Sequence, residues 1–152
     1  MENLYKISNS LGQGPSGEVF RATRDGGESE QQVVVKHFHQ EILKDPMAAE
    51  RIAAAARIHS TLDHPRIATV YDYDVNSQEG YIATEFVPGR SLAQLLGHSR
   101  GGTPLSTAGS YSLILQVARA LGYAHKRGIT HLGVSPSNIL CTQSGDIRLT
   151  DF

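Results

Sequence analysis

The sequence contains one cysteine, Cys141, and no long apolar run. A single cysteine excludes a disulfide within the chain, and its place on a predicted strand favours a small core residue over a nucleophile. No stretch is long and apolar enough to span a bilayer, and the first residues lack the apolar core of a signal peptide. These absences favour a reducing, cytoplasmic compartment.

The charges of the two signs nearly cancel, with 14 Lys and Arg against 15 Asp and Glu and a formal net charge of -1 at pH 7. Such a balance gives no electrostatic basis for binding nucleic acid or an acidic partner. The chain also lacks internal repeats, heptads and low-complexity tracts. Its 152 residues, 39% of them hydrophobic, suffice for one ordinary domain with its own core.

Glycines gather near the N-terminus in the stretch GQGPSG at residues 12–17. A predicted strand over residues 4–11 precedes them, and the strand formers of residues 18–23 follow, before a turn at residues 25–27. Glycines at this spacing let backbone N–H groups approach phosphate oxygens, although a dinucleotide-binding turn would lead into a helix. The glycines therefore lie between two strands, either as an ordinary hairpin or as a phosphate-binding loop.

The remaining pattern alternates strands with helices. A strand over residues 31–39 carries Lys36 after a run of valines, and Asp45 with Pro46 begins a helix predicted over residues 46–62. The other expected elements are strands at 67–75 and 81–86, a short helix at 91–97 capped by Ser91, a loop at 99–104, a helix at 106–127 closed by Gly128, and a hairpin of residues 139–141 and 147–149 around Ser144 and Gly145.

The segment HLGVSPSNIL at residues 131–140 resembles the catalytic loop of the protein kinase family, His-Arg-Asp-x-Lys-Pro-x-Asn-x-Leu. The glycine stretch, the Lys36 strand and Asp151-Phe152 match further motifs of that family in the same order, in the style of its bacterial Ser/Thr branch. The resemblance covers the whole chain. It implies an α+β fold, with an antiparallel five-stranded N-lobe and its αC helix over residues 1–88, and a truncated, mainly helical C-lobe over residues 89–152.

The resemblance also implies sites for ATP and Mg²⁺. Asn138 and Asp151 match the metal ligands, Thr84 the gatekeeper, and Val34 replaces the alanine that usually lines the adenine pocket, where it could crowd the base. The positions that match nucleotide-binding residues are Leu11, Gly12, Gly14, Gly17, Val19, Lys36, Glu85, Val87 and Leu140.

Several positions depart from the family pattern in ways that remove chemistry. Gly133 stands at the catalytic Asp, Leu132 at the preceding Arg and Ser135 at the Lys of the catalytic loop. Ala55 stands where the αC helix has the Glu that holds Lys36, and Glu50 is too far round the helix to replace it. A positioned general base contributes about 10²–10⁴ in rate, so the chain resembles a pseudokinase with little or no phosphotransfer.

Three functions remain open from the sequence. The first is a pseudokinase that binds ATP and Mg²⁺ weakly and signals through its conformation and a protein partner. The second is a kinase-fold interaction module without nucleotide, because Val34 and the missing Lys36 partner close the site. The third is a Ser/Thr kinase of low activity that works without the usual base.

Two expectations concern packing. By resemblance, His131 is structural and packs against Phe152. The helix at 106–127 has a narrow polar stripe of Ser112, Gln116, Arg119 and Lys126, and apolar residues cover most of its remaining circumference. Such a helix is built for burial on more than one side. In the family, helices after the position of Phe152 cover part of it, so residues 1–152 alone are expected to expose an apolar patch and to self-associate.

Overall fold

The structure is a computed structural model, and it describes residues 4–25, 30–76, 78–97 and 105–152. The turn expected at residues 25–27 and the loop expected at 99–104 therefore lie largely or wholly outside the described residues. The chain forms two compact units. The first unit comprises Met1–Thr61 with Thr69–Phe86, and the second comprises Leu62–Ala68 with Val87–Phe152.

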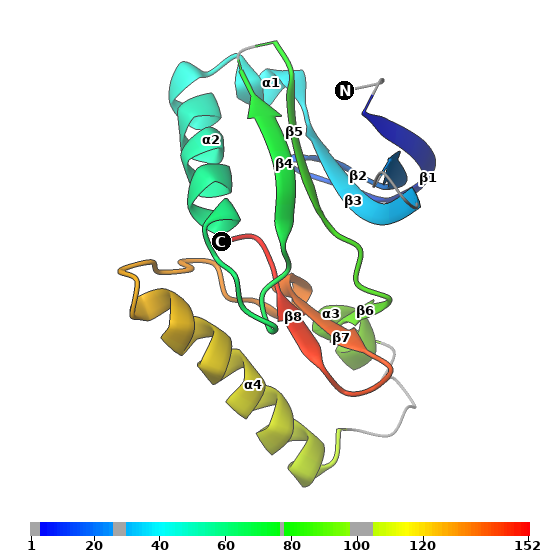
Figure 1. Cartoon of the computed structure of the whole chain (residues 1–152), viewed down its shortest axis with the longest axis vertical. Coiled ribbons are helices and arrows are strands. Elements are labelled where there is room, and N and C mark those ends of the chain that lie inside the picture. The colour runs from blue at the N-terminus through cyan, green and yellow to red at the C-terminus, as the bar shows by residue number, and fades with distance from the viewer. Residues whose placement is uncertain (1–3, 26–29, 77, 98–104) are drawn as a thin grey trace. The chain divides into compact units, whose positions relative to one another are not determined.

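The first unit is built on a five-stranded sheet in which every pair of neighbours is antiparallel. Its strand order is β1-β2-β3-β5-β4 (Figure 1). The strands are β1 (Tyr5–Gly14), β2 (Gly17–Asp25), β3 (Glu30–Phe38), β4 (Val70–Val75) and β5 (Gly80–Glu85). All five were expected from their strand-forming residues, but β1 runs three residues further than predicted, into the glycine stretch, and β4 begins at Val70, not at residue 67.

The described part of the first unit also has the helices α1 (Gln40–Leu43) and α2 (Pro46–Ser60). The carboxylate of Asp45 accepts a hydrogen bond from the Met47 N–H at 3.0 Å, so α2 begins with the predicted cap. Figure 1 shows α2 lying along the sheet beside β4. The packed core between them is a cluster of Phe38, Leu43 and Ala49, with Ile52, Val75 and Ile82 against it.

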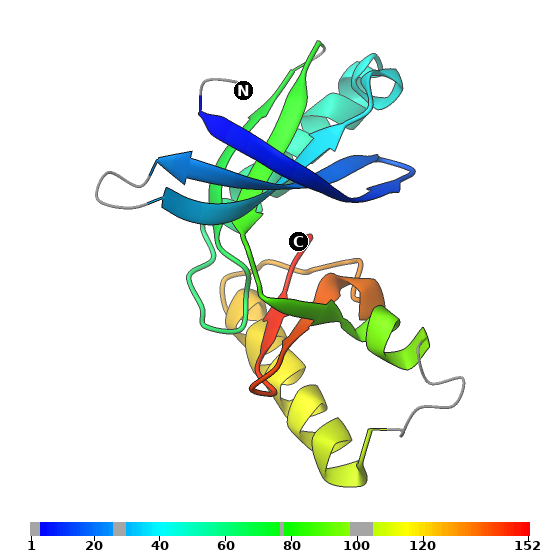
Figure 2. The same ribbon diagram turned by 90° about the vertical axis from the view of Figure 1, so that its right-hand side faces the viewer.

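A second hydrophobic cluster in this unit contains two tyrosines that share one carboxylate. The hydroxyls of Tyr5 and Tyr81 both donate to the same oxygen of Asp72, at 3.1 and 2.7 Å. Tyr5 lies on edge strand β1 and Asp72 on the opposite edge strand β4, so the sheet must curl strongly for them to meet, and its twist is visible in Figure 2. Burial, reinforced by the nearby Asp72 charge, raises the pKa of Tyr5 from 10.0 to about 12 and also raises that of Tyr81.

This raised pKa predicts a loss of stability in alkali. A group whose pKa is higher in the folded state stabilises that state fully below its unfolded pKa, here about 10, and loses the contribution as the pH rises to about 12. Two pKa units correspond to at most about 2–3 kcal/mol, and solvent screening of the partly buried hydroxyl reduces this contribution. We expect the free energy of unfolding to fall more steeply between pH 10 and 12 in the wild type than in Tyr5→Phe, measured by urea denaturation. Tyr111→Phe, at a side chain that is 72% exposed, should retain the wild-type slope; equal slopes in all three proteins would contradict the prediction.

In its described residues, the second unit contains a three-stranded antiparallel sheet and two α-helices. The strands, in the order β6-β7-β8, are β6 (Gly89–Ser91), β7 (Ile139–Thr142) and β8 (Ile147–Leu149), and the helices are α3 (Leu92–Gly97) and α4 (Thr107–His125). A 3₁₀ turn, η1 (Pro136–Asn138), precedes β7. The side chains of Ser91 and Ser106 accept hydrogen bonds from N–H groups at the starts of α3 and α4. Gly128 has a φ of 73° just after α4, so it ends this helix as predicted.

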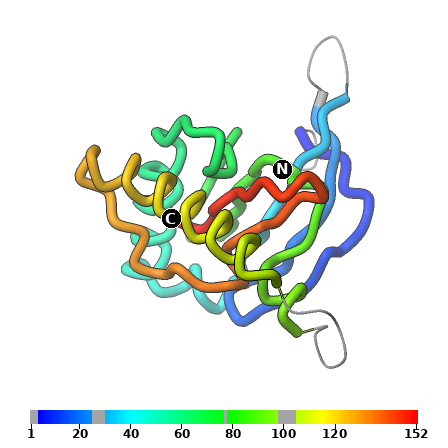
Figure 3. The backbone as a smooth tube through the Cα atoms, turned by 90° about the horizontal axis from the view of Figure 1, so that it is seen from below, coloured from blue at the N-terminus to red at the C-terminus, as the bar shows by residue number. Residues whose placement is uncertain are grey.

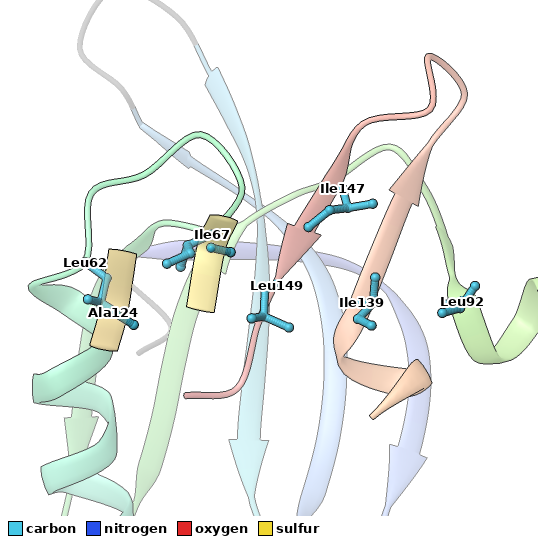
Figure 4. Close-up of a cluster of buried hydrophobic side chains, with 8 residues drawn as sticks. Leu62, Ile67, Leu92, Ala124, Ile139, Ile147 and Leu149 are labelled. Atoms are coloured by element: carbon cyan, nitrogen blue, oxygen red, sulfur yellow. The ribbon is translucent and has the colours of Figure 1, made fainter. Parts of the chain in front are cut away.

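The core of the second unit lies between α4, the β7–β8 hairpin and residues 62–68, and Figure 4 labels most of its side chains. Its buried members are Leu62, Ile67, Leu92, Ala120, Ala124, Ile139, Ile147 and Leu149. Gln116 of α4 clamps the hairpin: its amide nitrogen donates to the Gly145 carbonyl at 2.9 Å, and its amide oxygen accepts from the Ile147 N–H at 3.2 Å. In Figure 3 the α4 tube runs along this hairpin.

Ser112, Arg119 and Lys126 of the polar stripe of α4 are exposed as expected, and part of the apolar surface of the helix is exposed as well. Gln116, a member of that stripe, is buried, whereas Tyr111, Ile114 and Leu115 are 72%, 62% and 51% exposed. These apolar residues recur at three- and four-residue steps, so they lie on one side of the helix.

Among the described residues, no helix is long and apolar enough to cross a membrane.

Candidate functional site

The glycine stretch and Lys36 lie side by side in the first unit. Gly12 on β1 is the register partner of Val19 on β2, and Val19 is the partner of Lys36 on β3. Directly opposed residues of antiparallel strands project to the same face, so the Val19 and Lys36 side chains share a face of the sheet. Leu11 precedes Gly12 on the same strand and is half exposed.

The structural requirement for glycine differs among the three glycines of this stretch. A Cβ at Gly17 would overlap the His37 carbonyl, because β2 and β3 approach closely there. Among the described atoms, a Cβ at Gly12 would meet nothing within 4 Å, and one at Gly14 only the Gly17 carbonyl oxygen at 4.0 Å. Gly17 is therefore required by sheet packing, whereas Gly12 and Gly14 give the backbone freedom without being forced by contacts.

Lys36 is half-buried, and its ammonium lies 5.5 Å from the centre of the Phe38 ring. Ala55, which matches the position of the acidic partner, is a half-buried residue of α2 without a charge. Glu50 is exposed on that helix, which agrees with the expectation that it does not replace the acid at position 55.

The other residues expected around the nucleotide differ in their surroundings. Glu85 ends β5, and its backbone N–H donates to the Thr69 carbonyl at 2.8 Å. Val34 of β3 is the register partner of Thr84, the expected gatekeeper. In the second unit, Val87 is buried, and Leu140 of β7 is the register partner of both Ser91 and Arg148.

A hydrogen-bond network fixes the 131–140 segment in the second unit. The His131 Nε2 lies 2.9 Å from the Thr150 carbonyl, and its Nδ1 accepts from the Gly133 N–H at 3.3 Å. Because a carbonyl only accepts, the proton resides on Nε2. The rings of His131 and Phe152 lie 4.5 Å apart between centres, which confirms the predicted packing. The backbone frame of the segment is therefore complete.

The position that matches the family's catalytic base carries no reactive side chain. Gly133 has no side chain, and a Cβ there would meet only His131 atoms at 3.9 Å, so the surrounding structure leaves room for one. Leu132 is 95% exposed and has a φ of 56°, a conformation that disfavours a residue with a Cβ. An exposed leucine cannot pair with an anionic group as an arginine would.

Asn138 and Asp151 are held near each other by the backbone. The Thr150 N–H donates to the Asn138 carbonyl at 3.0 Å, and Asp151 is the next residue. The Asn138 amide nitrogen donates to the Gly133 carbonyl at 2.9 Å, so the amide oxygen is the atom that Asn138 can offer to a cation. One amide and one carboxylate oxygen fit Mg²⁺, which takes its other ligands from water and phosphates. Among the described residues, no cluster of three or more His, Cys, Asp or Glu side chains could hold a metal.

Electrostatic contacts around the hairpin support this segment without adding a reactive group. Arg66 forms an ion pair with Asp146 at the hairpin turn, and this contact, helped by Ser144, lowers the pKa of the Asp146 carboxyl. Burial raises the pKa of the Cys141 thiol, which disfavours the nucleophilic thiolate. Cys141 packs against the hydrophobic core, as its strand position predicts.

Two residues that hold the β7–β8 hairpin and the glycine stretch were not identified in that role from the sequence. Gln116 had a signal, since a polar residue within a broadly apolar helix invites the question of which buried backbone it satisfies. His39, which contacts the glycine stretch, had none, because it follows the end of β3 and its partner is 25 residues earlier.

Comparisons with known proteins identify the fold. Residues 5–152 match the protein kinase domain family. The chain is 35% identical over 157 residues to the serine/threonine-protein kinase PknA of Mycobacterium tuberculosis, covering 100% of this chain and 35% of PknA. It is 34% identical over 154 residues to a probable serine/threonine-protein kinase of Streptomyces coelicolor, covering 97% of this chain and 22% of that protein. The chain therefore belongs to the protein kinase family and is similar to its bacterial Ser/Thr members.

A solved structure agrees with this assignment. The M. tuberculosis PknI kinase domain matches with a TM-score of 0.83 and 28% identity, over 97% of this chain and 57% of that domain's chain. This match and the five-stranded antiparallel sheet with α2 confirm the expected kinase-like α+β fold. The chain spans only about a third or less of the length of the curated relatives it matches.

Proposed function

We propose that this protein is a kinase-fold signalling domain that binds ATP weakly in the presence of Mg²⁺ and transfers phosphate poorly or not at all. The observation that carries the proposal is Gly133, which puts no side chain at the base position of a segment whose hydrogen-bond frame is otherwise intact. A domain that keeps the frame and lacks the base is suited to signal by its conformation.

The nucleotide half of the proposal is supported by retained groups. Within the first unit, Gly12, Val19 and Lys36 are aligned across three strands. Within the second, the oxygens of Asn138 and Asp151 suit Mg²⁺. We assign nucleotide contacts to Leu11, Gly12, Gly14, Gly17, Val19, Lys36, Glu85, Val87 and Leu140. We also propose an N-lobe over residues 1–88, a partial C-lobe over 89–152, a cytoplasmic location and a protein partner.

The test is ATP binding by a polypeptide that includes residues 1–152. At ATP concentrations tenfold above the dissociation constant, bound ligand stabilises the fold by about 1.4 kcal/mol. We therefore expect the melting temperature to rise by about 3–5 °C with ATP and Mg²⁺, and by less without Mg²⁺. Lys36→Ala should abolish most of the shift, whereas Lys44→Ala, at an exposed position after α1, should retain it.

Two results would contradict the proposal. A shift that is independent of both Mg²⁺ and Lys36 would mean that ATP binds elsewhere. Robust transfer of labelled γ-phosphate to the protein itself or to a generic substrate would show an active Ser/Thr kinase despite Gly133.

A second candidate function is an interaction module without nucleotide. Val34 favours it, because this residue adds two methyl groups at the position that lines the adenine pocket in the family. The complete absence of an ATP shift in the wild type, with a shift in Val34→Ala, would select this function.

A further inference from the structure

His39 contacts the first arm and the tip of the turn that carries the glycine stretch. Its backbone N–H donates to the Ser16 carbonyl at 3.2 Å, and its Nε2 lies 3.1 Å from the Gly14 carbonyl oxygen. Gly14 ends β1 and Gly17 begins β2, so residues 15 and 16 form the tip of the turn. His39, which directly follows β3, thus holds the first arm of the turn through its side chain and the tip of the turn through its backbone.

His39 is the hydrogen-bond donor in both contacts. A carbonyl oxygen only accepts, so the side chain donates through Nε2–H, which is present in the neutral Nε2–H tautomer and in the imidazolium. Because a peptide unit is planar, the bond to Ser16 also sets the orientation of the Ser16–Gly17 peptide. Both carbonyls, whose oxygens would repel a phosphate, are engaged by donors on His39.

The identity of residue 39 is not explained by its other structural role. His39 is the N-cap of α1, yet within the described chain its side chain makes no capping hydrogen bond. Ser, Thr, Asp and Asn are the preferred caps. The His39 carbonyl accepts from the Ile42 and Leu43 N–H groups whatever side chain it carries. The imidazole is therefore used for Gly14 and not for the helix.

We propose that His39 is a positioning residue, which holds the turn at residues 14–17 in the conformation that receives the phosphates of a nucleotide. Glycine-rich turns lose much conformational entropy when they become ordered. A hydrogen bond that already orders the turn in the free protein reduces the entropy lost on ligand binding. The ligand half of this inference rests on the proposed function, whereas the tether itself is a property of the free protein.

Two substitutions separate positioning from folding. His39→Ser supplies a preferred helix cap but is too short to reach Gly14, and His39→Gln supplies an amide N–H on a longer side chain. We expect His39→Ser to keep or raise the melting temperature, to speed amide hydrogen exchange in peptides covering residues 12–18, and to weaken ATP binding about fivefold. His39→Gln should restore both exchange and affinity in part. His125→Ser, at an exposed position in α4, should change neither.

Each outcome decides a stated point. Unchanged exchange at residues 12–18 in His39→Ser would overturn the tether, whether or not ATP binds. Faster exchange with unchanged ATP affinity would overturn the positioning role and leave the proposed function intact. Absence of ATP binding by the wild type would refute the proposed function and the positioning role together, while the exchange rates would still establish or exclude the tether.

Discussion

A purified polypeptide of residues 1–152 is expected to self-associate at micromolar concentrations. Tyr111, Ile114 and Leu115 form an exposed apolar strip on α4, and Leu105 just before the helix is also 45% exposed. Contiguous apolar surface of this kind is uncommon on soluble monomers, because its burial against a second molecule is favourable at about 25 cal/mol per Å². Sedimentation velocity should show species of at least twice the mass of the 16.5 kDa chain, and a dye for apolar surface should bind.

Charged substitutions in the strip provide the matched comparison. The double variant Ile114→Glu/Leu115→Lys adds no net charge and should shift the protein towards monomer. Leu96→Lys, on an exposed leucine of α3, should not. A monodisperse wild-type monomer that unfolds cooperatively and binds no dye would show that the strip is tolerated in water, and this prediction would be wrong.

Gly133→Asp alone is expected to leave phosphotransfer at background, although a general base is typically worth about 10²–10⁴ in rate. The backbone at position 133 accepts a side chain, since a Cβ there has no described atom closer than 3.9 Å. The reason for failure lies in the first unit, where Ala55 supplies no acid to orient Lys36 for the phosphates. We expect Gly133→Asp/Ala55→Glu to bind ATP about three- to fivefold more tightly than Gly133→Asp, as one ion pair of up to about 1 kcal/mol allows.

The measurements are single-turnover transfer of labelled γ-phosphate and ATP affinity by calorimetry. Ala54→Glu is the control, because it adds the same charge one residue away, about 100° round the helix. Strong transfer by Gly133→Asp alone would show that the missing base is the sole defect. Weaker ATP binding by the Ala55→Glu variant, with tighter binding by Ala54→Glu, would show that the alignment of α2 with the family is off by one residue.

The local pattern of the sequence was enough for most of the elements. Asp45 and Pro46 start α2, Ser106 caps α4, and Gly128 and Gly145 take the positive φ values that end a helix and turn a hairpin. These signals act within a few residues of where they stand, so they do not depend on the rest of the fold. Short elements gave no such signal: α1 has four residues, and β6 has three and exists through its pairing with β7.

The candidate site divides in the same way. The sequence alone shows that Lys36, Asn138 and Asp151 are present and that Gly133 supplies no base. Folding cannot add a side chain that is not encoded. The contacts that give these residues their surroundings were settled only by the tertiary structure.

Three contacts show the difference. The His39 imidazole on Gly14, the Asp72 carboxylate between two tyrosines and the Gln116 amide on the β7–β8 hairpin join residues that are at most 25, 67 and 31 positions apart, respectively. Hydrogen bonds act only within about 3.5 Å, so such pairs exist only once the sheet has curled or the helix has packed on the hairpin. The sequence by itself determined which chemical groups this protein has and which it lacks, and the packing of distant segments decided which of them touch.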